Sequence, residues 1–371
     1  MDLSIFKKKG KKKDQILSID LGTHLTKGVL AKVKGDNLEL INYAIVESEG
    51  VSHASEPAQL GKLIKKVVDT LGGSAKTISL ALGGPECVLR PAEVSLVPKK
   101  DMILMMKHNS KNYLQQDFPD YAFDCYVIPC VLEASKEDDD SENEGRDQEG
   151  TVESKPGSGK TKAKVLVGGI PKQTINNVQE AVKAAGLAVD FITPNLVSPI
   201  NTLERVQHEL FKEEPIAVVD IGYASSNINI LSNGQLILNR VVGFGGKTLT
   251  KGLSNALSID SAEAEGLKVG MPQEVEQQLR PLLASLCQEL RVSINYFEVQ
   301  QDVTVSQIFL SGGTARSKVI VDALQEELVV PCQSLNTIEI MEINLEPEAA
   351  GELADASPQL AVAVGTILAQ L

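Results

Sequence analysis

Apolar and polar positions follow the same order in two separate regions of the chain. In the first region, β-type runs over residues 16–20, 26–33 and 38–46 predict three strands. Apolar side chains at helical spacing then predict a helix over 57–71, which Gly72 and Gly73 end. A buried strand is expected over 77–82. The order is three strands, a helix and a strand.

The second region repeats this order further along the chain. Strands are expected over 216–220, 227–231 and 235–241, with Asn233-Gly234 as a type I′ turn. Helices follow over 246–257 and 261–269, and a long one over 272–299 carries Pro281 as a candidate kink. A strand over 305–310 and a helix over 317–328 complete the region. The repeat predicts an α/β fold made of two duplicated ribonuclease-H-like domains.

Residues 84–195 do not follow the order and predict an inserted α+β subdomain. Strands are expected over 88–97, 121–132 and 164–167, and helices over 101–116 and 174–185. Within it, residues 136–162 are acidic and lack apolar periodicity, which predicts a disordered loop. The expected organisation is a basic tail (1–14), a first domain (15–83 and 196–215), the insertion (84–195) and a second domain (216–371).

Composition excludes several classes of function. A net charge of −13 argues against a nucleic-acid-binding protein, whose surface would be basic. No apolar run is long enough to span a membrane. The five cysteines lack CxxC spacing, which favours reduced core thiols. The lysines of residues 7–13 permit two interpretations: a solvated tail, or weak peripheral contact with an anionic membrane surface.

Each region begins with an apolar strand that ends in Asp-x-Gly. Asp20, Gly22 and Thr23 open the first hairpin, and Lys27 starts its second strand. Glycine lets backbone N–H groups approach an anion, and a carboxylate can hold a hydrated Mg²⁺ against phosphate oxygens. Lys27 is placed to reach a phosphate.

The second hairpin and three later segments extend this candidate site. Asp220 and Gly222 lie 200 positions after Asp20 and Gly22. Two hairpins that face each other would hold ATP with Mg²⁺, and the two aspartates are the candidate metal ligands. The later candidates are backbone cradles and a charged helix face: Gly245 and Gly246, Glu265 and Lys268, and Gly312, Gly313 and Thr314. Residues 157–161 (GSGKT) lack the first glycine and the preceding strand of a P-loop.

These segments, in this order, resemble the actin-like ATPase superfamily and its FtsA-like branch. The nearest resemblance is to the PilM family of type IV pilus assembly proteins. It rests on residues 6–9 (FKKK) before the first hairpin, 244–250 (FGGKTLT), 262–265 (AEAE) with Lys268, 185–187 (AGL) and 361–365 (AVAVG). The acidic loop at 136–162 is longer than the family pattern, so the likeness is not extended across it.

The resemblance implies four subdomains, with the insertion as the subdomain called 1C, and ATP with Mg²⁺ in the cleft between the domains. It also implies a cytoplasmic scaffold at the inner face of the membrane. Such a scaffold would bind the N-terminal tail of a PilN-like inner-membrane protein between subdomains 1A and 1C, and would contact the pilus motor and platform. Tyr223 and Ala224 replace the acidic residue and second glycine expected of a hydrolytic loop, so slow or negligible turnover is expected.

Three alternatives stay open at this stage. A type II secretion platform uses a similar cytoplasmic component. An FtsA-like division protein would carry a C-terminal amphipathic membrane helix, whereas this sequence ends at residues 367–371 (ILAQL), directly after the last predicted helix. A small-molecule kinase of the superfamily would need a general base in the insertion, for which Asp124 is the candidate.

Overall fold

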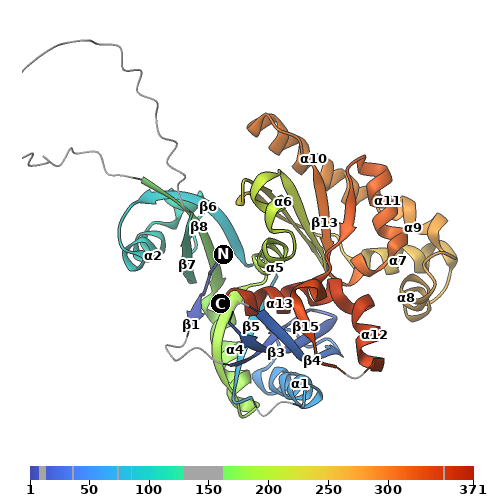
Figure 1. Cartoon of the computed structure of the whole chain (residues 1–371), viewed down its shortest axis with the longest axis horizontal. Helices are drawn as coiled ribbons and strands as arrows, with labels where there is room; N and C mark the ends of the chain where they lie inside the picture. The colour runs from blue at the N-terminus through green and yellow to red at the C-terminus, as the bar shows by residue number, and fades with distance from the viewer. Residues whose placement is uncertain (8–13, 36, 73–74, 85, 129–161, 346) are drawn as a thin grey trace, which may run out of the picture.

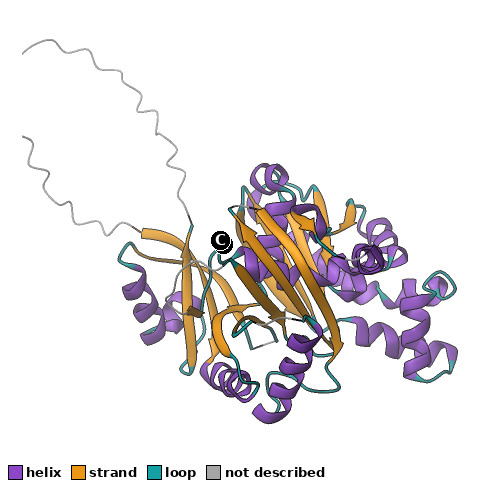
Figure 2. Cartoon of the chain, turned by 60° about the horizontal axis from the view of Figure 1, so that its bottom comes forward, coloured by secondary structure: helices purple, strands orange, loops and turns teal. Residues whose placement is uncertain are grey.

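A computed structural model of the chain describes residues 1–7, 14–35, 37–72, 75–84, 86–128, 162–345 and 347–371. Its largest element is a seven-stranded sheet in the order β1-β9-β5-β2-β3-β4-β15 (Figures 1 and 2). The strands are β1 (Phe6–Lys7), β2 (Gln15–Asp20), β3 (Leu25–Lys34), β4 (Asn37–Glu47), β5 (Thr77–Leu82), β9 (Ala188–Pro194) and β15 (Met341–Ile343). Strands β2, β3 and β4 form an antiparallel meander, whereas β5 and β9 run parallel to β2.

A second sheet of five strands has the order β12-β11-β10-β13-β14. Its strands are β10 (Ile216–Ile221), β11 (Ser226–Ser232), β12 (Gln235–Val242), β13 (Gln307–Ser311) and β14 (Cys332–Ser334). Again a meander is followed by parallel strands. The registers match as well, since Asp20 lies opposite Lys27 and Asp220 lies opposite Asn227. The predicted duplication is confirmed, and so is the left-handed turn at Asn233-Gly234, where φ is 49° and 71°.

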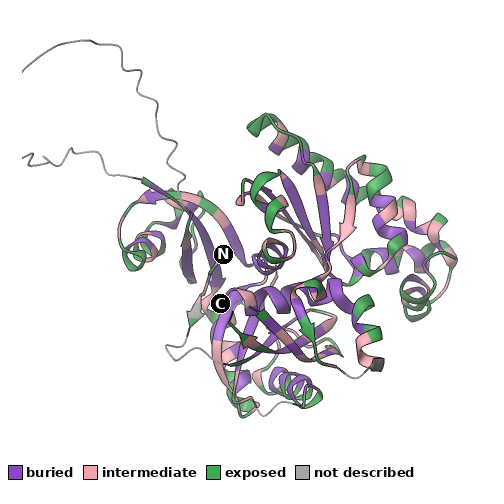
Figure 3. Cartoon of the chain, in the orientation of Figure 1, coloured by how far each residue is buried: buried purple, intermediate pink, exposed green. Residues whose placement is uncertain are grey.

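Helices cover both faces of the first sheet because its strands alternate their apolar side chains between two cores. Leu17 and Ile19 of β2 belong to a core that includes α1 and α4, whereas Ile16 belongs to one that includes α13. The helices of this part of the molecule are α1 (Pro57–Thr70), α4 (Lys172–Ala184), α5 (Ser198–Val206), α6 (His208–Glu213), α12 (Pro347–Ala356) and α13 (Ala361–Leu368). Figure 3 shows that buried residues follow the strands and the helix faces that cover them.

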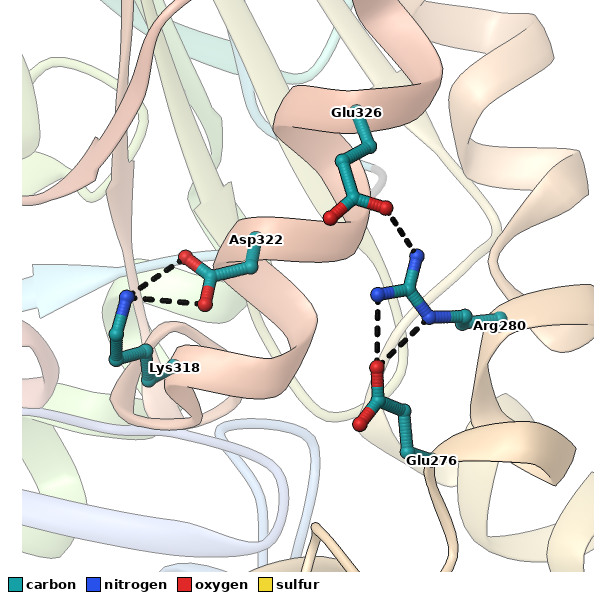
Figure 4. A network of polar contacts seen from close by, with 5 residues as sticks. All are labelled: Glu276, Arg280, Lys318, Asp322 and Glu326. Carbon is teal, nitrogen blue, oxygen red and sulfur yellow. Dashed lines mark hydrogen bonds and ion pairs between the residues drawn. The ribbon is translucent and has the colours of Figure 1, made fainter.

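The second sheet is covered by α7 (Gly246–Leu257), α8 (Ser261–Gly270), α9 (Glu276–Leu282), α10 (Ala284–Gln301) and α11 (Lys318–Leu328). The long helix expected over 272–299 is therefore two helices. Pro281 lies inside α9, lacks a backbone N–H, and is followed by the break at Leu283. Arg280 joins α9 to α11: its guanidinium lies 2.6 Å from Glu326 and 2.7 Å from Glu276 (Figure 4).

The insertion forms a small sheet of its own in the order β6-β8-β7. It contains β6 (Val88–Ser95), α2 (Lys99–His108), α3 (Ser110–Leu114), β7 (Tyr121–Val127) and β8 (Lys162–Pro171). The single helix expected over 101–116 is two helices, since Asn109 leaves helical geometry between them. A separate core includes Met102, Met106 and Phe118.

Two segments do not lie in the domains that the sequence predicts for them. The sequence predicts residues 172–194 to be part of the insertion, but β9 joins the first sheet and α4 packs on α1, where Gly61 lets the helices approach. The sequence predicts residues 341–368 to be part of the second domain, but β15 pairs with β4 and α13 packs on β2 and α5. Apolar faces account for both placements, because α4 and α13 bury theirs against the first sheet.

Several expectations fall outside the described residues: the loop at 136–162 apart from Lys162, the GSGKT segment, Cys130, and Lys8 to Lys13. Cys87, Cys125, Cys287 and Cys332 are free thiols, and the first three are buried. Across the described ranges, no helix combines the length and apolarity needed to cross a membrane.

Candidate functional site

A cavity of about 250 Å³ lies between the two sheets, and both hairpin turns line it. Asp20 and Asp220 therefore face one shared cleft, although they come from different domains. The other predicted residues that line the cavity are Gly22, Thr23, Lys27, Gly222, Gly246, Glu265, Lys268, Gly312, Gly313 and Thr314. Of the predicted set, Gly245 alone is not part of this lining. The structure thus brings together twelve of the thirteen predicted positions.

The first hairpin places a lysine beside its aspartate. Asp20 is buried at the end of β2, and Lys27 lies opposite it in register on β3. The Lys27 ammonium lies 3.0 Å from Asp20 Oδ2. Gly22 makes the turn possible, because a Cβ there would lie 2.2 Å from the Leu25 carbonyl oxygen. The result is a fixed ion pair at the wall of the cavity, with the lysine charge available to an anion.

The second hairpin holds the partly buried Asp220 at the end of β10. Ser311 Oγ donates a hydrogen bond of 2.9 Å to Asp220 Oδ1. Gly312, at a φ of +90°, lies so close that a Cβ would be 3.0 Å from this oxygen. Burial raises the pKa of Asp220; the Asp20 charge adds to this rise, whereas Lys27 opposes it. A cation between the two aspartates would relieve this unfavourable electrostatic arrangement.

A buried charged cluster lines the cavity between α7 and α8. The Lys268 ammonium donates to Glu265 Oε2 at 2.6 Å, to Thr250 Oγ1 at 2.8 Å and to the Gly246 carbonyl at 3.2 Å. Thr250 Oγ1 also donates to Glu265. Burial lowers the pKa of Lys268, and the Glu265 carboxylate partly offsets this effect. The Lys268 ammonium therefore holds the partly exposed Glu265 carboxylate in position at the cavity wall, where a polar ligand can contact it.

The glycine pair at the start of α7 has a different role from the one expected. We expected Gly245 and Gly246 to offer free N–H groups to an anion. Instead Gly246 N–H donates to the Gly222 carbonyl and Lys247 N–H donates to the Tyr223 carbonyl, each at 2.9 Å. A Cβ on Gly245 would lie 2.4 Å from the Tyr223 oxygen. The start of α7 therefore supports the second hairpin turn.

Sequence reasoning missed an aromatic contact across the cleft. His24 of the first turn stacks on Tyr223 of the second, with ring centroids 4.2 Å apart and planes 19° apart. Both residues line the cavity, as do His53 and Asn195. Burial lowers the pKa of His53. His24 and Tyr223 each follow a predicted Asp-x-Gly motif, but only the facing of the two hairpins brings their rings together.

Asp124, the candidate base of a kinase, is not part of the cavity lining. It lies on β7, where Lys99 pairs with its carboxylate at 2.9 Å. The backbone N–H of Ser4 donates to its second oxygen at 2.7 Å. Asp124 therefore links the insertion to the N-terminal segment.

A sequence model of the type IV pilus assembly protein PilM family matches residues 150–370, which is more than half of the chain. The chain belongs to the PilM family. Curated relatives include the cell division protein FtsA of Streptococcus pneumoniae, 22% identical over 84% of the chain, and that of Bacillus subtilis, 24% identical over 68%. The chain covers 66% and 57% of the length of these relatives. The predicted PilM and FtsA-like resemblance is confirmed.

Solved structures agree on the fold. A PilM–PilN type IV pilus biogenesis complex matches with a TM-score of 0.76 and 22% identity, covering 97% of this chain and 99% of the other. EutJ of Carboxydothermus hydrogenoformans matches with a TM-score of 0.54 and 14% identity, covering 98% and 92%. MreB5 of Spiroplasma citri, solved with AMPPNP, matches at 0.50 and 10% identity, covering 96% of each chain. The predicted actin-like fold of this PilM family member is confirmed.

Proposed function

We propose that this PilM family member is an ATP-dependent scaffold of type IV pilus assembly. The observation that carries the proposal is that Asp20 and Asp220, from two duplicated hairpins of different domains, line one cavity. A ligand held from both sides stabilises the closed arrangement of the two domains by its higher affinity for that arrangement. MreB5, which shares the fold, was solved with an ATP analogue, and this supports a nucleotide in the equivalent cleft.

The residues of the cavity fit a Mg²⁺-nucleotide. In the described part of the chain no three His, Cys, Asp or Glu side chains cluster as a metal site. Two facing aspartates suit a hydrated Mg²⁺ that completes its shell with water and phosphate oxygens. Asp20 and Asp220 would hold this ion, which supplies charge neutralisation to the phosphates. Lys27 and Thr23 would contact phosphate oxygens, Glu265 and Lys268 the nucleoside, and Gly312 to Thr314 would let it lie against the backbone.

Slow turnover is part of the proposal. Hydrolysis needs an aligned water and stabilised transition-state charge. Tyr223 occupies the second turn and is stacked on His24, so an aromatic pair stands where a hydrolytic loop would place a carboxylate. Bound ATP then holds the two domains together, and its hydrolysis is not what drives the function.

Lys268→Met tests the nucleoside end of the site. It should weaken ATP binding about tenfold, because Glu265 loses the ammonium that holds it 2.6 Å away. Titration calorimetry measures the affinity, and a thermal melt checks that the variant is folded. Lys251→Met, an exposed lysine of α7, is the matched control and should bind as the wild type does. Equal affinity in a folded Lys268→Met variant would remove this residue from the site.

We further propose that the scaffold binds the cytoplasmic N-terminal tail of a PilN-like inner-membrane protein, in the seam between the first sheet and the insertion. The PilM–PilN complex, which covers nearly the whole chain at a TM-score of 0.76, supports such a partner. The protein would thereby lie at the inner face of the membrane, next to the pilus motor and platform proteins. The lysines of residues 7–13 would add weak attraction to anionic lipid.

Tail binding gives the direct test. A synthetic peptide of the first residues of the PilN-like protein encoded in the same genome should bind the purified chain, measured by fluorescence anisotropy. A scrambled peptide is the control. Absence of binding with and without Mg·ATP would contradict the pilus scaffold and favour a division role like that of the FtsA relatives.

A further inference from the structure

The first seven residues lie as an extended segment along the seam between the first sheet and the insertion. Ile5 N–H donates to the Ile192 carbonyl at 2.9 Å. Strand β1 then pairs antiparallel with β9, Phe6 opposite Ile192 and Lys7 opposite Phe191. Figure 1 places the N-terminus beside β8 and α5. The segment therefore extends the edge of the seven-stranded sheet at β9.

The segment is also anchored to the insertion. Leu3 is fully buried, and its Cδ1 would lie 3.5 Å from a Cβ built on Gly168 of β8. The Leu3 side chain is therefore buried next to Gly168 of β8 and Pro194 of β9. The Ser4 N–H donates to Asp124 of β7, which is only 4% exposed. One short peptide thus bridges β7, β8 and β9 with an apolar anchor, a charge-assisted hydrogen bond and a strand pairing.

These contacts have the components of peptide recognition: a buried apolar side chain, a backbone hydrogen bond to a carboxylate and a short strand pairing. Strand β1 pairs over two residues only, so few backbone hydrogen bonds hold it to β9 and it can open at low cost. Once the segment leaves, β9 presents an unpaired edge, Asp124 loses a donor, and the space beside Gly168 opens. An extended peptide recognised by strand addition needs an unpaired edge and side-chain pockets of this kind.

We infer that residues 1–7 are a displaceable internal ligand of a peptide-binding groove formed by β7, β8 and β9. The groove takes an extended peptide with an apolar side chain two residues before the one whose N–H pairs with Ile192. Resting on the proposed function, the competing peptide is the tail of the PilN-like protein, which must displace residues 1–7 to bind. Because residues 1–7 occupy the groove, they lower the apparent affinity of the chain for the partner's tail.

The test uses the chain's own segment as a probe. A peptide of residues 1–7 (MDLSIFK) with a C-terminal fluorophore is titrated into the full chain and into a variant that lacks residues 2–7. Binding to the deletion variant should be at least tenfold tighter than to the full chain. A Leu3→Asp peptide should bind at least tenfold more weakly than the native peptide. An Asp2→Ala peptide is the matched control, because Asp2 is exposed, and it should bind unchanged. Equal binding to both proteins, or none to a folded deletion variant, overturns the inference.

A second measurement uses the full chain, so that misfolding of the deletion variant does not decide the outcome. Leu3→Asp in the full chain should speed amide hydrogen exchange in residues 1–7 and in β9, and raise affinity for the PilN-like tail about tenfold. If the tail binds wild type and Leu3→Asp equally, the inference fails while the proposed function stands. If the tail binds neither protein, the proposed partner fails, and the peptide titration still decides whether residues 1–7 are displaceable.

Discussion

Asp220→Asn should lower the affinity for Mg·ATP about a hundredfold, or about 2.7 kcal/mol, without loss of folding. The asparagine keeps the oxygen that accepts from Ser311 at 2.9 Å, so the local packing survives. It removes the negative charge that a cation would need, on one side of a cavity that Asp20 lines on the other. Titration calorimetry with and without Mg²⁺ measures the effect, which should be largest with the ion present.

Stability should respond to Asp220→Asn in the opposite direction. Because burial raises the pKa of Asp220 above its unfolded value of about 3.9, the folded chain keeps this proton to a higher pH than the unfolded chain. The free energy of unfolding of the wild type therefore falls as the pH rises from the unfolded pKa towards the folded pKa of Asp220. The variant lacks this loss. Its melting temperature should therefore rise relative to that of the wild type as the pH increases. Asp69→Asn, an exposed site on α1, should change neither property. If Asp220→Asn binds Mg·ATP with wild-type affinity, Asp220 is not a metal ligand.

Gly365→Ala should cost about 3 kcal/mol of stability, the largest effect expected for an alanine at any of the described glycines. Gly365 lies in α13, and a Cβ there would be 1.8 Å from the Ser198 carbonyl oxygen of α5. Backbone atoms cannot move aside as a flexible side chain can. Helices α13 and α5 would have to separate, opening the core that holds Ala361 of α13 with Ile200 and Leu203 of α5. The midpoint of urea unfolding measures the loss.

A glycine in a nearby helix supplies the control. Gly351 of α12 is exposed, and a Cβ there would meet no atom within 4 Å. Gly351→Ala should raise stability by about 0.5–1 kcal/mol, since alanine favours the helix. If Gly365→Ala and Gly351→Ala changed the stability equally, close packing of α13 on α5 would not explain the glycine at position 365.

Local pattern was enough to predict the duplicated sheets. The Asp-x-Gly turns, the glycine-ended helices and the Asn233-Gly234 turn each depend on neighbouring residues, and the structure has them at or near the expected positions. Pro281 also predicts a kink, but whether a proline bends or ends a helix depends on packing around the break at Leu283.

What the pattern could not predict depends on contacts between distant segments. Residues 172–194 follow the insertion in the chain, but their apolar faces complete the first sheet. Strand β15 is three residues long, too short for periodicity to distinguish from a loop. The stack of His24 on Tyr223 exists only because two separate turns face each other. Likewise, residues 1–7 resemble a tail until their pairing with β9 is known.

The pairing of β15 with β4 affects how the chain is made. Asn344, next to β15, donates to Glu39 of β4 across 305 positions of sequence. At about 5–20 residues per second, a ribosome needs roughly 15 to 60 s to cover that distance. Until then the outer edge of β4 is uncovered, and α13 has not yet formed over β2. A nascent chain of this protein therefore passes through a long interval in which it can associate wrongly with other unfinished chains, and chaperones that hold emerging polypeptides should matter more for it than for a protein of sequentially closed domains.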